Sequence, residues 1–433
     1  MAISPTSELH LDVHHLTRVE GHGNIVVDAR DGRLERCDLE VVEAPRFFEA
    51  MLRGRPYEQA SHLASRICGI CAVAHATASL RATEHALGVE VTPQTEALRR
   101  LAFCGEMIDS HVLHSYMLVA PDLVRLESVV ALASRQPEIV VRALRMKKVA
   151  GDLCAALAGR HTHPIAMTVG GFHHLPAAGE LQVLRDRLEA MGPDVEATVE
   201  LFRALPLPAF ERETEYVALQ HPHGYEFIDG QIVSSDGGVW PVESYRDVAR
   251  EHVVGHSTAK HTRHTRQAYM VGALARYVLN HARLRPRAQA AAETLGLTPE
   301  CRNPYWITVA QVVELVHCVE EAGALIDELL ADGLRPETPA SPARLTGEGV
   351  GAVEAPRGTL YHHYAIEDGV LTQANCIIPT GQNLANIEAD MRELVPQVIS
   401  KGPQGVTRDL EMLVRAYDPC ISCSTHQLEV RFV

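Results

Sequence analysis

Alternating apolar and polar residues near both ends of the chain predict β-strands, and a long region with helical spacing separates them. Between residues 9 and 43, the stretches HLDVHHL, GNIVVDA and RCDLEVVE alternate in this way, and Asp31-Gly32 supplies a hairpin turn. Residues 359–378 alternate again around a second turn at Asp368-Gly369. We therefore expect a β-rich segment near each end.

The region from about residue 46 to 335 carries apolar residues mostly at helical spacing. Pro93 opens one such segment, and apolar residues follow it at three- and four-residue intervals. Residues 215–242 interrupt this region with a β-like pattern, and residues 334–358 are rich in Pro, Gly and Ala and predict a loop. Further helices are predicted over residues 125–159, 179–204, 265–285, 304–332 and 382–398.

No internal repeat, low-complexity tract or flexible linker divides the chain. The pattern predicts an α+β fold that is predominantly helical, with a central helix bundle and small β-sheets near the N-terminus and in the C-terminal part. We expect residues 1–433 to form a single integrated domain.

Composition and charge exclude several classes of protein. Of 433 residues, 46% are hydrophobic and 22% charged, which is enough to bury a large core. The net charge of −15, without a long basic block, argues against a nucleic-acid or anionic-membrane partner. No run of about 18 apolar residues predicts a transmembrane segment. The N-terminus lacks a secretory signal, so we expect a cytoplasmic protein.

Ten cysteines are too few for a disulfide scaffold, but four of them form two CxxC pairs. Cys68/Cys71 and Cys420/Cys423 lie near opposite ends of the chain. Two such pairs can make one tetrathiolate site for zinc, iron–sulfur or another late transition metal. Spacing alone leaves open a structural zinc site, a catalytic thiolate–metal site and unrelated cysteines. A thioredoxin-like role is disfavoured because neither pair sits in a βαβ pattern.

The residues around the two pairs resemble the metal motifs of nickel–iron hydrogenase large subunits. Arg66-Ile67-Cys68-Gly69-Ile70-Cys71, followed by His75, is similar to the N-terminal motif of that family. Asp418-Pro419-Cys420-Ile421-Ser422-Cys423, followed by His426, is similar to the C-terminal motif. Further matches are RVEGH at 18–22, EAPRG at 354–358 and NCIIPT at 375–380, with weaker ones at His163-Pro164, Gly170-Gly171 and GALAR at 272–276. The resemblance therefore covers nearly the whole chain and implies that family's fold.

The resemblance implies that four thiolates hold nickel, and that two of them bridge to an iron carrying carbon monoxide and cyanide. Carried over, Cys68 and Cys420 are terminal nickel ligands, and Cys71 and Cys423 are the bridges. Thiolates suit a metal that must change oxidation state, because they donate electron density to it. The implied reaction is the reversible heterolytic cleavage of dihydrogen to protons and electrons.

The same motifs imply residues that handle the proton. The thiolate of Cys420 is the expected first proton acceptor, although a purely structural ligand would also fit this position. Glu20 matches the family's proton-relay glutamate, and such a relay needs a carboxylate within reach of the thiolate. An exposed acid after a strand is the alternative explanation of Glu20.

Other residues of the motifs are expected to surround the metals. Arg357 would lie over the open metal position as a base or as an electrostatic guide, and with Thr380 would donate hydrogen bonds to the cyanides. Pro356, in the same EAPRG motif, is expected to contact the cofactor. Asp418 would orient Arg357, and His75 would hydrogen-bond a bridging sulfur.

The resemblance also implies a buried magnesium or other divalent ion near the C-terminus. Glu49, the carbonyl of Cys376 and His426 would supply its protein ligands, and waters would complete the octahedron. Glu49 could instead lie on the solvated side of an amphipathic helix.

One position departs from the pattern of the better-known uptake enzymes. Those enzymes carry an aspartate directly before the HxxH of the helix after the first CxxC, whereas Ser110 precedes His111 and His114 here. A serine at this position favours the cytoplasmic cofactor-coupled or bidirectional branches of the family.

The partners follow from the cysteine assignment. The nickel–iron site uses both CxxC pairs, so we expect no iron–sulfur cluster in this chain and a separate iron–sulfur small subunit as its electron acceptor. Flavin/NAD(P) diaphorase or heterodisulfide-reductase-like subunits are compatible partners beyond it. The alternatives are a dihydrogen sensor of the same family and a scaffold subunit with a structural tetrathiolate metal.

Histidine is abundant, at 24 residues, and four histidines cluster at positions 252, 256, 261 and 264. The spacing of His252 and His256 would suit zinc if they lay on a helix, but solvated or packed histidines are the favoured explanation. The five cysteines without partner spacing are expected to be buried thiols: Cys37, Cys104, Cys154, Cys301 and Cys318.

Overall fold

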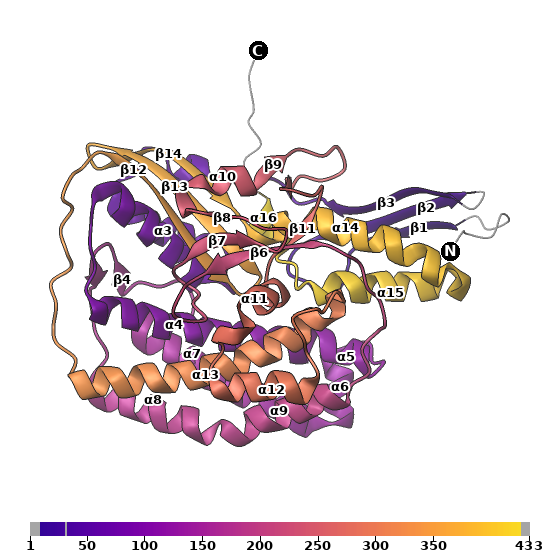
Figure 1. The fold of residues 1–433 in the computed structure, drawn as a ribbon, viewed down its shortest axis with the longest axis horizontal. Helices are drawn as coiled ribbons and strands as arrows, with labels where there is room; N and C mark the ends of the chain where they lie inside the picture. Colours follow the sequence, from indigo (N-terminus) through magenta and orange to yellow (C-terminus); the bar gives the residue numbers. More distant parts are fainter. Residues whose placement is uncertain (1–8, 31–32, 426–433) are drawn as a thin grey trace, which may run out of the picture.

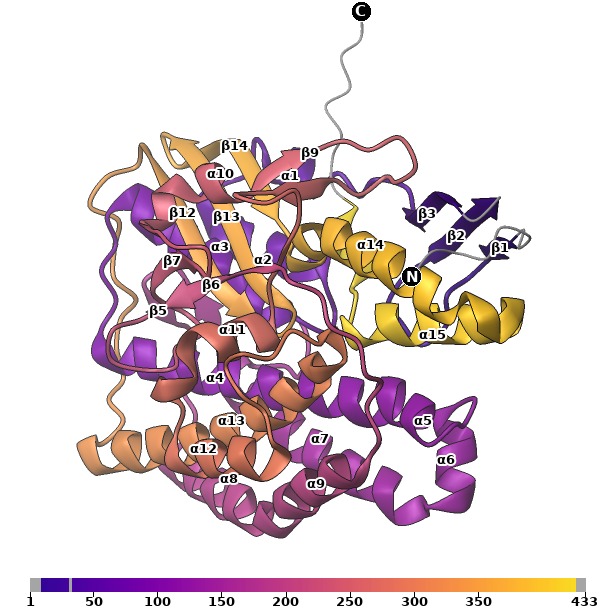
Figure 2. The same ribbon diagram turned by 45° about the vertical axis from the view of Figure 1, so that its right-hand side comes forward.

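A layer of long helices forms one side of the molecule, and most of the β-structure lies on the other side (Figures 1 and 2). The computed structural model describes residues 9–30 and 33–425. The helices of this layer are α4 (Pro93–Val112), α7 (Pro137–Ala158), α8 (Ala178–Ala190), α9 (Gly192–Ala204), α12 (Pro286–Leu295) and α13 (Ile307–Asp332). These helices confirm the predicted helix bundle. None of the described helices is both long and apolar enough to cross a membrane.

Local sequence explains where several of these helices begin and end. Pro93 is the first residue of α4, as predicted, and the Oγ1 of Thr92 caps the helix by accepting from the N–H of Thr95 at 3.1 Å. Helices α7 and α12 end at glycines with left-handed backbone, Gly159 and Gly296. The predicted 179–204 helix is two helices, α8 and α9, with Met191 between them. Shorter helical elements connect α4 to α7: a π-helical turn Leu113–Val119, α5 (Ala120–Leu123) and α6 (Val129–Arg135).

The N-terminal sheet has three antiparallel strands in the order β1 (Leu9–Val13), β2 (Gly23–Arg30) and β3 (Arg33–Val41). Its alternating residues bury one face, including Ile25, Val27 and Leu39. The strands confirm the prediction for residues 9–43, while the expected turn at Asp31-Gly32 lies outside the described residues.

The middle of the chain forms a four-stranded sheet, which confirms the predicted β-structure at 215–242. Its order is β11 (Tyr269–Met270), β6 (Glu215–Gln220), β7 (Gln231–Ser234) and β8 (Val239–Trp240). The predicted 265–285 helix begins only with α11 (Ala273–Asn280), because β11 pairs with β6 before it. Smaller elements of this region are β4 (Met167–Thr168), β5 (Gly171–Phe172), α10 (Tyr245–Val248), β9 (Arg250–His252) and β10 (His261–Arg263).

The C-terminal part contains the antiparallel sheet β12 (Gly347–Ala355), β13 (Gly358–Glu367) and β14 (Val370–Ile377). The loop predicted for 334–358 is therefore wrong over β12. Gly347, Gly349 and Gly351 lie on one face of this strand, against helix α3 (Ala72–Leu87). A Cβ at Gly351 would lie 2.1 Å from the carbonyl oxygen of Ala78. The glycines that suggested a loop are instead what allows a helix backbone to approach the strand closely.

The chain ends with α14 (Pro379–Val398), α15 (Gly402–Ala416) and α16 (Ile421–Ser424). Helix α14 begins three residues before the predicted start at 382, and α15 was not predicted. Figure 1 shows α14 and α15 lying beside the N-terminal sheet, so the two ends of the chain share one region of the fold. The short helices α1 (Phe48–Leu52) and α2 (Ala60–Ala64) lead to the first cysteine pair. The helix-rich α+β prediction is confirmed.

We predict that Gly351→Ala lowers the free energy of unfolding by about 3 kcal/mol, because the added methyl group must push α3 away from β12. Urea unfolding followed by circular dichroism would measure this change. The matched control is Gly179→Ala, where an added Cβ meets no heavy atom within 4 Å and stability should hold or rise slightly. Equal stability of the two variants would contradict the close approach of helix and strand.

Candidate metal centre

The first cysteine pair lies where a short helical turn passes into helix α3. Cys68 follows the 3-10 turn Ser65–Ile67, and Cys71 is the N-cap residue of α3. The backbone N–H of Cys71 donates to the Sγ of Cys68 at 3.2 Å. The N-terminus of a helix favours negative charge, so this position suits thiolates.

The second pair meets the first in the interior, although the two pairs come from opposite ends of the chain. The Sγ of Cys420 lies 3.6 Å from that of Cys68 and 2.6 Å from that of Cys423. The sulfurs of Cys68, Cys420 and Cys423 lie within 4.8 Å of one another, as do ligand atoms of Cys71, His75 and Cys423. All four cysteines are buried. The structure thus brings together the four predicted thiolate ligands.

Contacts among the thiols of the cluster shift their pKa values in opposite directions. Hydrogen bonds from Cys420, Cys423 and Cys71 lower the pKa of Cys68 well below its ordinary value. Hydrogen bonds with Cys423, Cys68 and Cys71, together with burial, raise the pKa of Cys420 well above it. Several thiolates can coexist in this interior only beside a cation, so the donor set fits a soft transition metal.

The RVEGH segment, residues 18–22, holds the second pair through backbone contacts. Glu20 and Cys420 form a parallel β-bridge, and the N–H of Ile421 donates to the carbonyl of Glu20 at 2.9 Å. Gly21 has a φ of +88°, and a Cβ there would lie 2.7 Å from the backbone nitrogen of Ser422. Only glycine combines that conformation with so close an approach.

The carboxylate of Glu20 reaches the cluster directly. Its Oε2 accepts from the Sγ of Cys420 at 3.2 Å and from the N–H of Ser422 at 3.1 Å. Glu20 is half-buried, whereas the Cys420 thiol that it accepts from is buried. The alternative of an exposed acid after a strand therefore does not describe Glu20.

Arg46 ties the two cysteine segments together and was not recognised from the sequence. Its Nη1 donates to the carbonyls of Ile67 at 2.8 Å and Ser422 at 3.2 Å, and its Nη2 donates to Arg66 at 3.2 Å. Its backbone N–H also donates to the carbonyl of Thr425 at 2.9 Å. Only the place of Arg46, in the same stretch as Glu49, could have drawn attention to it.

Glu106 supports the first pair from α4 and was also missed. Its two carboxylate oxygens accept from the N–H groups of Val73 at 2.6 Å and Ala74 at 2.9 Å, at the start of α3. Burial raises the pKa of Glu106 well above its usual value, although these backbone hydrogen bonds act in the opposite direction. It caps the helix whose N-terminus carries Cys71.

Arg357 lies over the cluster and is held by Asp418, as predicted for this pair. Its Nε donates to the carbonyl of Asp418 at 2.7 Å, and its Nη2 donates to the Oδ1 at 2.8 Å. Its Nη1 lies 3.4 Å from the Oγ of Ser110, the residue that replaces the aspartate of the uptake enzymes. Burial acts to lower the pKa of Arg357, but Asp418 and the cysteines outweigh it and raise the pKa well above its usual value.

A small cavity of about 10 Å³, measured as the space open to the centre of a water molecule, lies between Arg357 and the cysteines. Its walls combine sulfur, apolar groups and three side chains that can donate hydrogen bonds: Cys71, His75, Ala355, Arg357, Leu360, Ile378, Pro379, Thr380, Cys420 and Cys423. The Oγ1 of Thr380 accepts from the N–H of Cys420 at 3.0 Å, which leaves the hydroxyl hydrogen to donate elsewhere. Small ligands on a metal could find both apolar and donor surfaces here.

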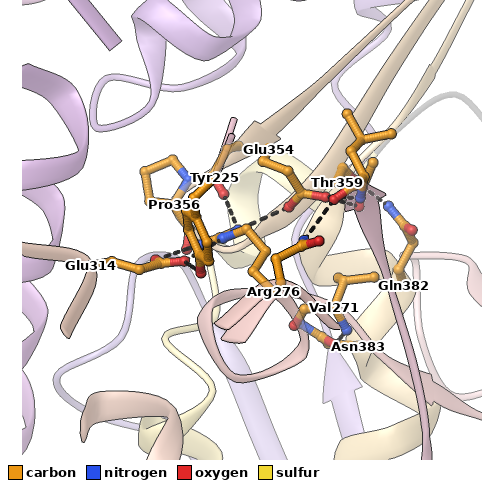
Figure 3. A network of polar contacts seen from close by, with 12 residues as sticks. Tyr225, Val271, Arg276, Glu314, Glu354, Pro356, Thr359, Gln382 and Asn383 are labelled. Carbon is orange, nitrogen blue, oxygen red and sulfur yellow. Dashed lines mark hydrogen bonds and ion pairs between the residues drawn. The ribbon is translucent and has the colours of Figure 1, made fainter. Parts of the chain in front are cut away.

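Pro356 does not line this cavity, but its carbonyl helps to hold the loop that carries Arg357. Arg276, from the weak GALAR match, donates to the carbonyls of Ala355 at 2.9 Å and Pro356 at 3.1 Å (Figure 3). The same guanidinium forms ion pairs with Glu314 at 2.6 Å and Glu354 at 2.9 Å. Burial would raise the pKa of Glu314, but Arg276 and His111 lower it well below its usual value. The network is charged and buried, and it positions the loop.

His75 begins a chain of polar contacts that leads away from Cys71. Its Nδ1 lies 3.1 Å from the Nε2 of His362, whose Nδ1 lies 2.6 Å from the hydroxyl of Tyr364. Cys376 lies beside this chain, with its Sγ 3.6 Å from His362. His75 is buried and also lines the cavity, with a ring nitrogen within 4.8 Å of the sulfurs of Cys71 and Cys423.

The three residues expected to bind a divalent ion are only partly described. Glu49 is 6% exposed and therefore does not lie on a solvated helix face. Its charge adds to burial in raising the pKa of the Cys376 thiol well above its usual value, so the two residues lie near each other. His426 lies outside the described residues.

We predict that Arg46→Lys speeds the loss of bound metal to a chelator by about tenfold or more, because a single ammonium nitrogen cannot replace the two guanidinium nitrogens that contact the three carbonyls. Metal release from the purified protein to an excess of chelator would measure this. Arg53→Lys, at an exposed position of the same segment, is the matched control and should release metal at the wild-type rate. Equal rates in both variants would show that Arg46 does not hold the two segments together.

Known proteins share both this sequence and this fold. The nickel-dependent hydrogenase family model matches residues 46–138 and 242–426. The chain is 35% identical to sulfhydrogenase 1 subunit alpha of Pyrococcus furiosus, over 96% of this chain and 98% of that protein. It is 29% identical to the NAD-reducing hydrogenase HoxS subunit beta of Cupriavidus necator, over 96% and 95%.

The structure matches the crystal structure of an NAD+-reducing nickel–iron hydrogenase in the dihydrogen-reduced state with a TM-score of 0.87 and 28% identity. The match covers 96% of this chain and 99% of that one. These relatives confirm the resemblance drawn from the cysteine motifs. The chain belongs to the nickel-dependent hydrogenase family and is the large, catalytic subunit of a hydrogenase.

Proposed function

We propose that the four thiolates hold a nickel–iron centre whose iron carries carbon monoxide and cyanide, with Cys68 and Cys420 as terminal nickel ligands and Cys71 and Cys423 as bridges. The observation that carries this proposal is the buried cluster of four sulfurs directly beside the guanidinium of Arg357. Cys71, Cys420 and Cys423 line the cavity and Cys68 does not, so the cavity lies beside both proposed bridging ligands and one proposed terminal ligand.

The cavity walls suit small ligands of two kinds. Arg357 and Thr380 supply hydrogen-bond donors for cyanide nitrogens, and Leu360 and Ile378 supply apolar contact for carbon monoxide. Pro356 acts through its carbonyl, because its hydrogen bond to Arg276 keeps the loop and therefore Arg357 in place. Asp418 orients the guanidinium from the other side.

When bound, the metal centre supplies the heterolytic cleavage of dihydrogen. The sulfur of Cys420 receives the proton and the carboxylate of Glu20, 3.2 Å away, takes it onward toward the surface. Arg357 acts as an electrostatic guide rather than as the base, because Asp418 and the cysteines keep its pKa well above the usual value. His75 orients the bridging side of the cluster.

A divalent ion, magnesium in the first instance, is proposed at Glu49 with the carbonyl of Cys376 and His426. The buried carboxylate of Glu49 is the kind of oxygen ligand that magnesium prefers. The ion would stabilise the negative charge of Glu49 in the interior.

Electrons must leave through another subunit. Among the described residues, the clusters that could hold a metal contain no cysteine outside the two CxxC pairs. We therefore propose an iron–sulfur small subunit, with flavin/NAD(P) diaphorase or heterodisulfide-reductase-like subunits as candidate partners beyond it, in a cytoplasmic complex. We further propose that residues 1–433 act as one integrated domain, since the site is complete only when both ends meet.

We predict that Glu20→Gln slows hydrogen–deuterium exchange of dihydrogen by about 100-fold or more, because the amide cannot take the proton from Cys420. Metal content should stay at the wild-type level, since an amide oxygen can still accept from Ser422. Glu43→Gln is the matched control. Glu43 accepts a hydrogen bond from the hydroxyl of Ser422, not from its backbone N–H, and should be dispensable for exchange. Unchanged exchange in Glu20→Gln would remove Glu20 from the proton path.

We also predict that Cys420→Ala abolishes this exchange, because a terminal ligand and the first proton acceptor are lost together. Cys301→Ala changes a half-buried cysteine that is distant in the sequence from both CxxC pairs, and should leave the exchange intact. Elemental analysis of the wild-type large subunit, separated from its iron–sulfur partner, should find about one nickel and one iron per chain. Zinc without nickel would instead indicate a structural tetrathiolate scaffold, and retained exchange in Cys420→Ala would overturn the ligand assignment.

A further inference from the structure

Two histidines and a glutamate form a second cluster of potential metal ligands, apart from the cysteines. One ligand atom each of His256, His261 and Glu388 lies within 4.8 Å of the other two. His261 and Glu388 are buried, with 3% and 7% exposure, and His256 is half-buried. The set shares no residue with the proposed nickel–iron or magnesium sites.

The three residues come from two elements that are distant in the sequence. His261 begins β10 and His256 lies in the turn that joins β10 to β9, so the histidines sit on a hairpin and not on the helix that would have suited zinc. Glu388 lies on α14, whose first turn carries Thr380. Thr380 lines the cavity beside the cysteines, and Glu388 follows it by eight residues on the same helix. At the rise of an α-helix, Glu388 therefore lies roughly 12 Å along α14 from Thr380.

His261 has an unused ring nitrogen in this cluster. Within the described part of the chain, its Nε2 is buried without a hydrogen-bond partner. The ring lies edge-on to that of His256, with centroids 5.6 Å apart, and to that of His252 at 6.1 Å. A buried polar atom without a partner destabilises the folded state, and a ligand bond to a metal would remove this cost.

Glu388 is oriented before any ion binds. Its Oε1 accepts from the backbone N–H of Leu39 on β3 at 3.1 Å and lies 2.7 Å from the Nε2 of His256. Such a backbone hydrogen bond to a ligating carboxylate is the kind of outer contact that fixes ligands in metal sites. A cation could replace the proton shared between His256 and Glu388.

We propose that His256, His261 and Glu388 bind one zinc-type divalent ion, with water as the fourth ligand. Two imidazole nitrogens and one carboxylate oxygen are a known ligand set of zinc, and magnesium would prefer oxygen ligands alone. The bound ion would tie the β9–β10 hairpin to α14. The Oγ1 of Thr262 on β10 already donates to the carbonyl of Gln382 on α14 at 3.2 Å, so the ion would strengthen an existing contact.

Cobalt(II) chloride, added to the purified nickel-loaded complex after mild chelation, tests the site. We expect visible ligand-field bands of tetrahedral cobalt without the near-ultraviolet charge-transfer band of a cobalt thiolate. His261→Gln and Glu388→Gln should each weaken this binding by about tenfold or more. His223→Gln, an exposed histidine outside the cluster, is the matched control and should bind as the wild type does.

Absence of these bands in the wild type, or equal affinity in Glu388→Gln and His223→Gln, would overturn the proposal. A measurement on the wild type alone covers the case in which a variant does not fold. X-ray absorption at the zinc edge of the zinc-treated complex should show nitrogen and oxygen neighbours and no sulfur. Sulfur neighbours would place the zinc on cysteines and refute the site.

Discussion

Four thiols gathered in one buried cluster constrain the rest of the molecule, because they cannot all lose their protons in the interior without a cation beside them. The fold meets this constraint by joining the two ends of the chain. The backbone of Glu20 pairs with that of Cys420. Arg46 donates both to the carbonyl of Ile67, just before the first cysteine pair, and to the carbonyl of Ser422, within the second. The metal site is thus also the point at which the N-terminal and C-terminal segments close the structure.

The cations around the cluster are fixed by their own buried partners. Asp418 holds the guanidinium of Arg357 over the cavity, and Arg276 anchors the loop that carries Arg357 by binding Glu314 and Glu354 (Figure 3). Buried ion pairs add little net stability, but removing one partner leaves an uncompensated charge and is strongly destabilising. The arrangement therefore fixes the geometry of Arg357 more than it adds stability.

Much of the architecture could be predicted from periodicity, because helices and strands bury one face and the apolar residues record it. Strand β1 and helix α7 follow this rule, since buried residues alternate along β1 and recur mostly every three or four positions along α7. Strand β12 does not, since Gly347, Gly349 and Gly351 carry no side chain to record a face and only the close approach of α3 explains them. Arg46 and Glu106 were missed for a related reason. Each acts on backbone groups, so its partners leave no pattern in the sequence.

The sequence by itself indicated the family: two ordered CxxC pairs, with the motifs around Glu20, Arg357 and Thr380, resemble those of nickel–iron hydrogenase large subunits. Residue types and their spacing along the chain are properties of the sequence that do not depend on the fold. Only the tertiary structure decided which groups meet. It turned Arg357 toward Asp418, brought Glu20 within 3.2 Å of the sulfur of Cys420, and set His256 and His261 opposite Glu388. Such contacts join residues far apart in the chain, and their geometry depends on the packing of whole helices and sheets, which no local pattern encodes.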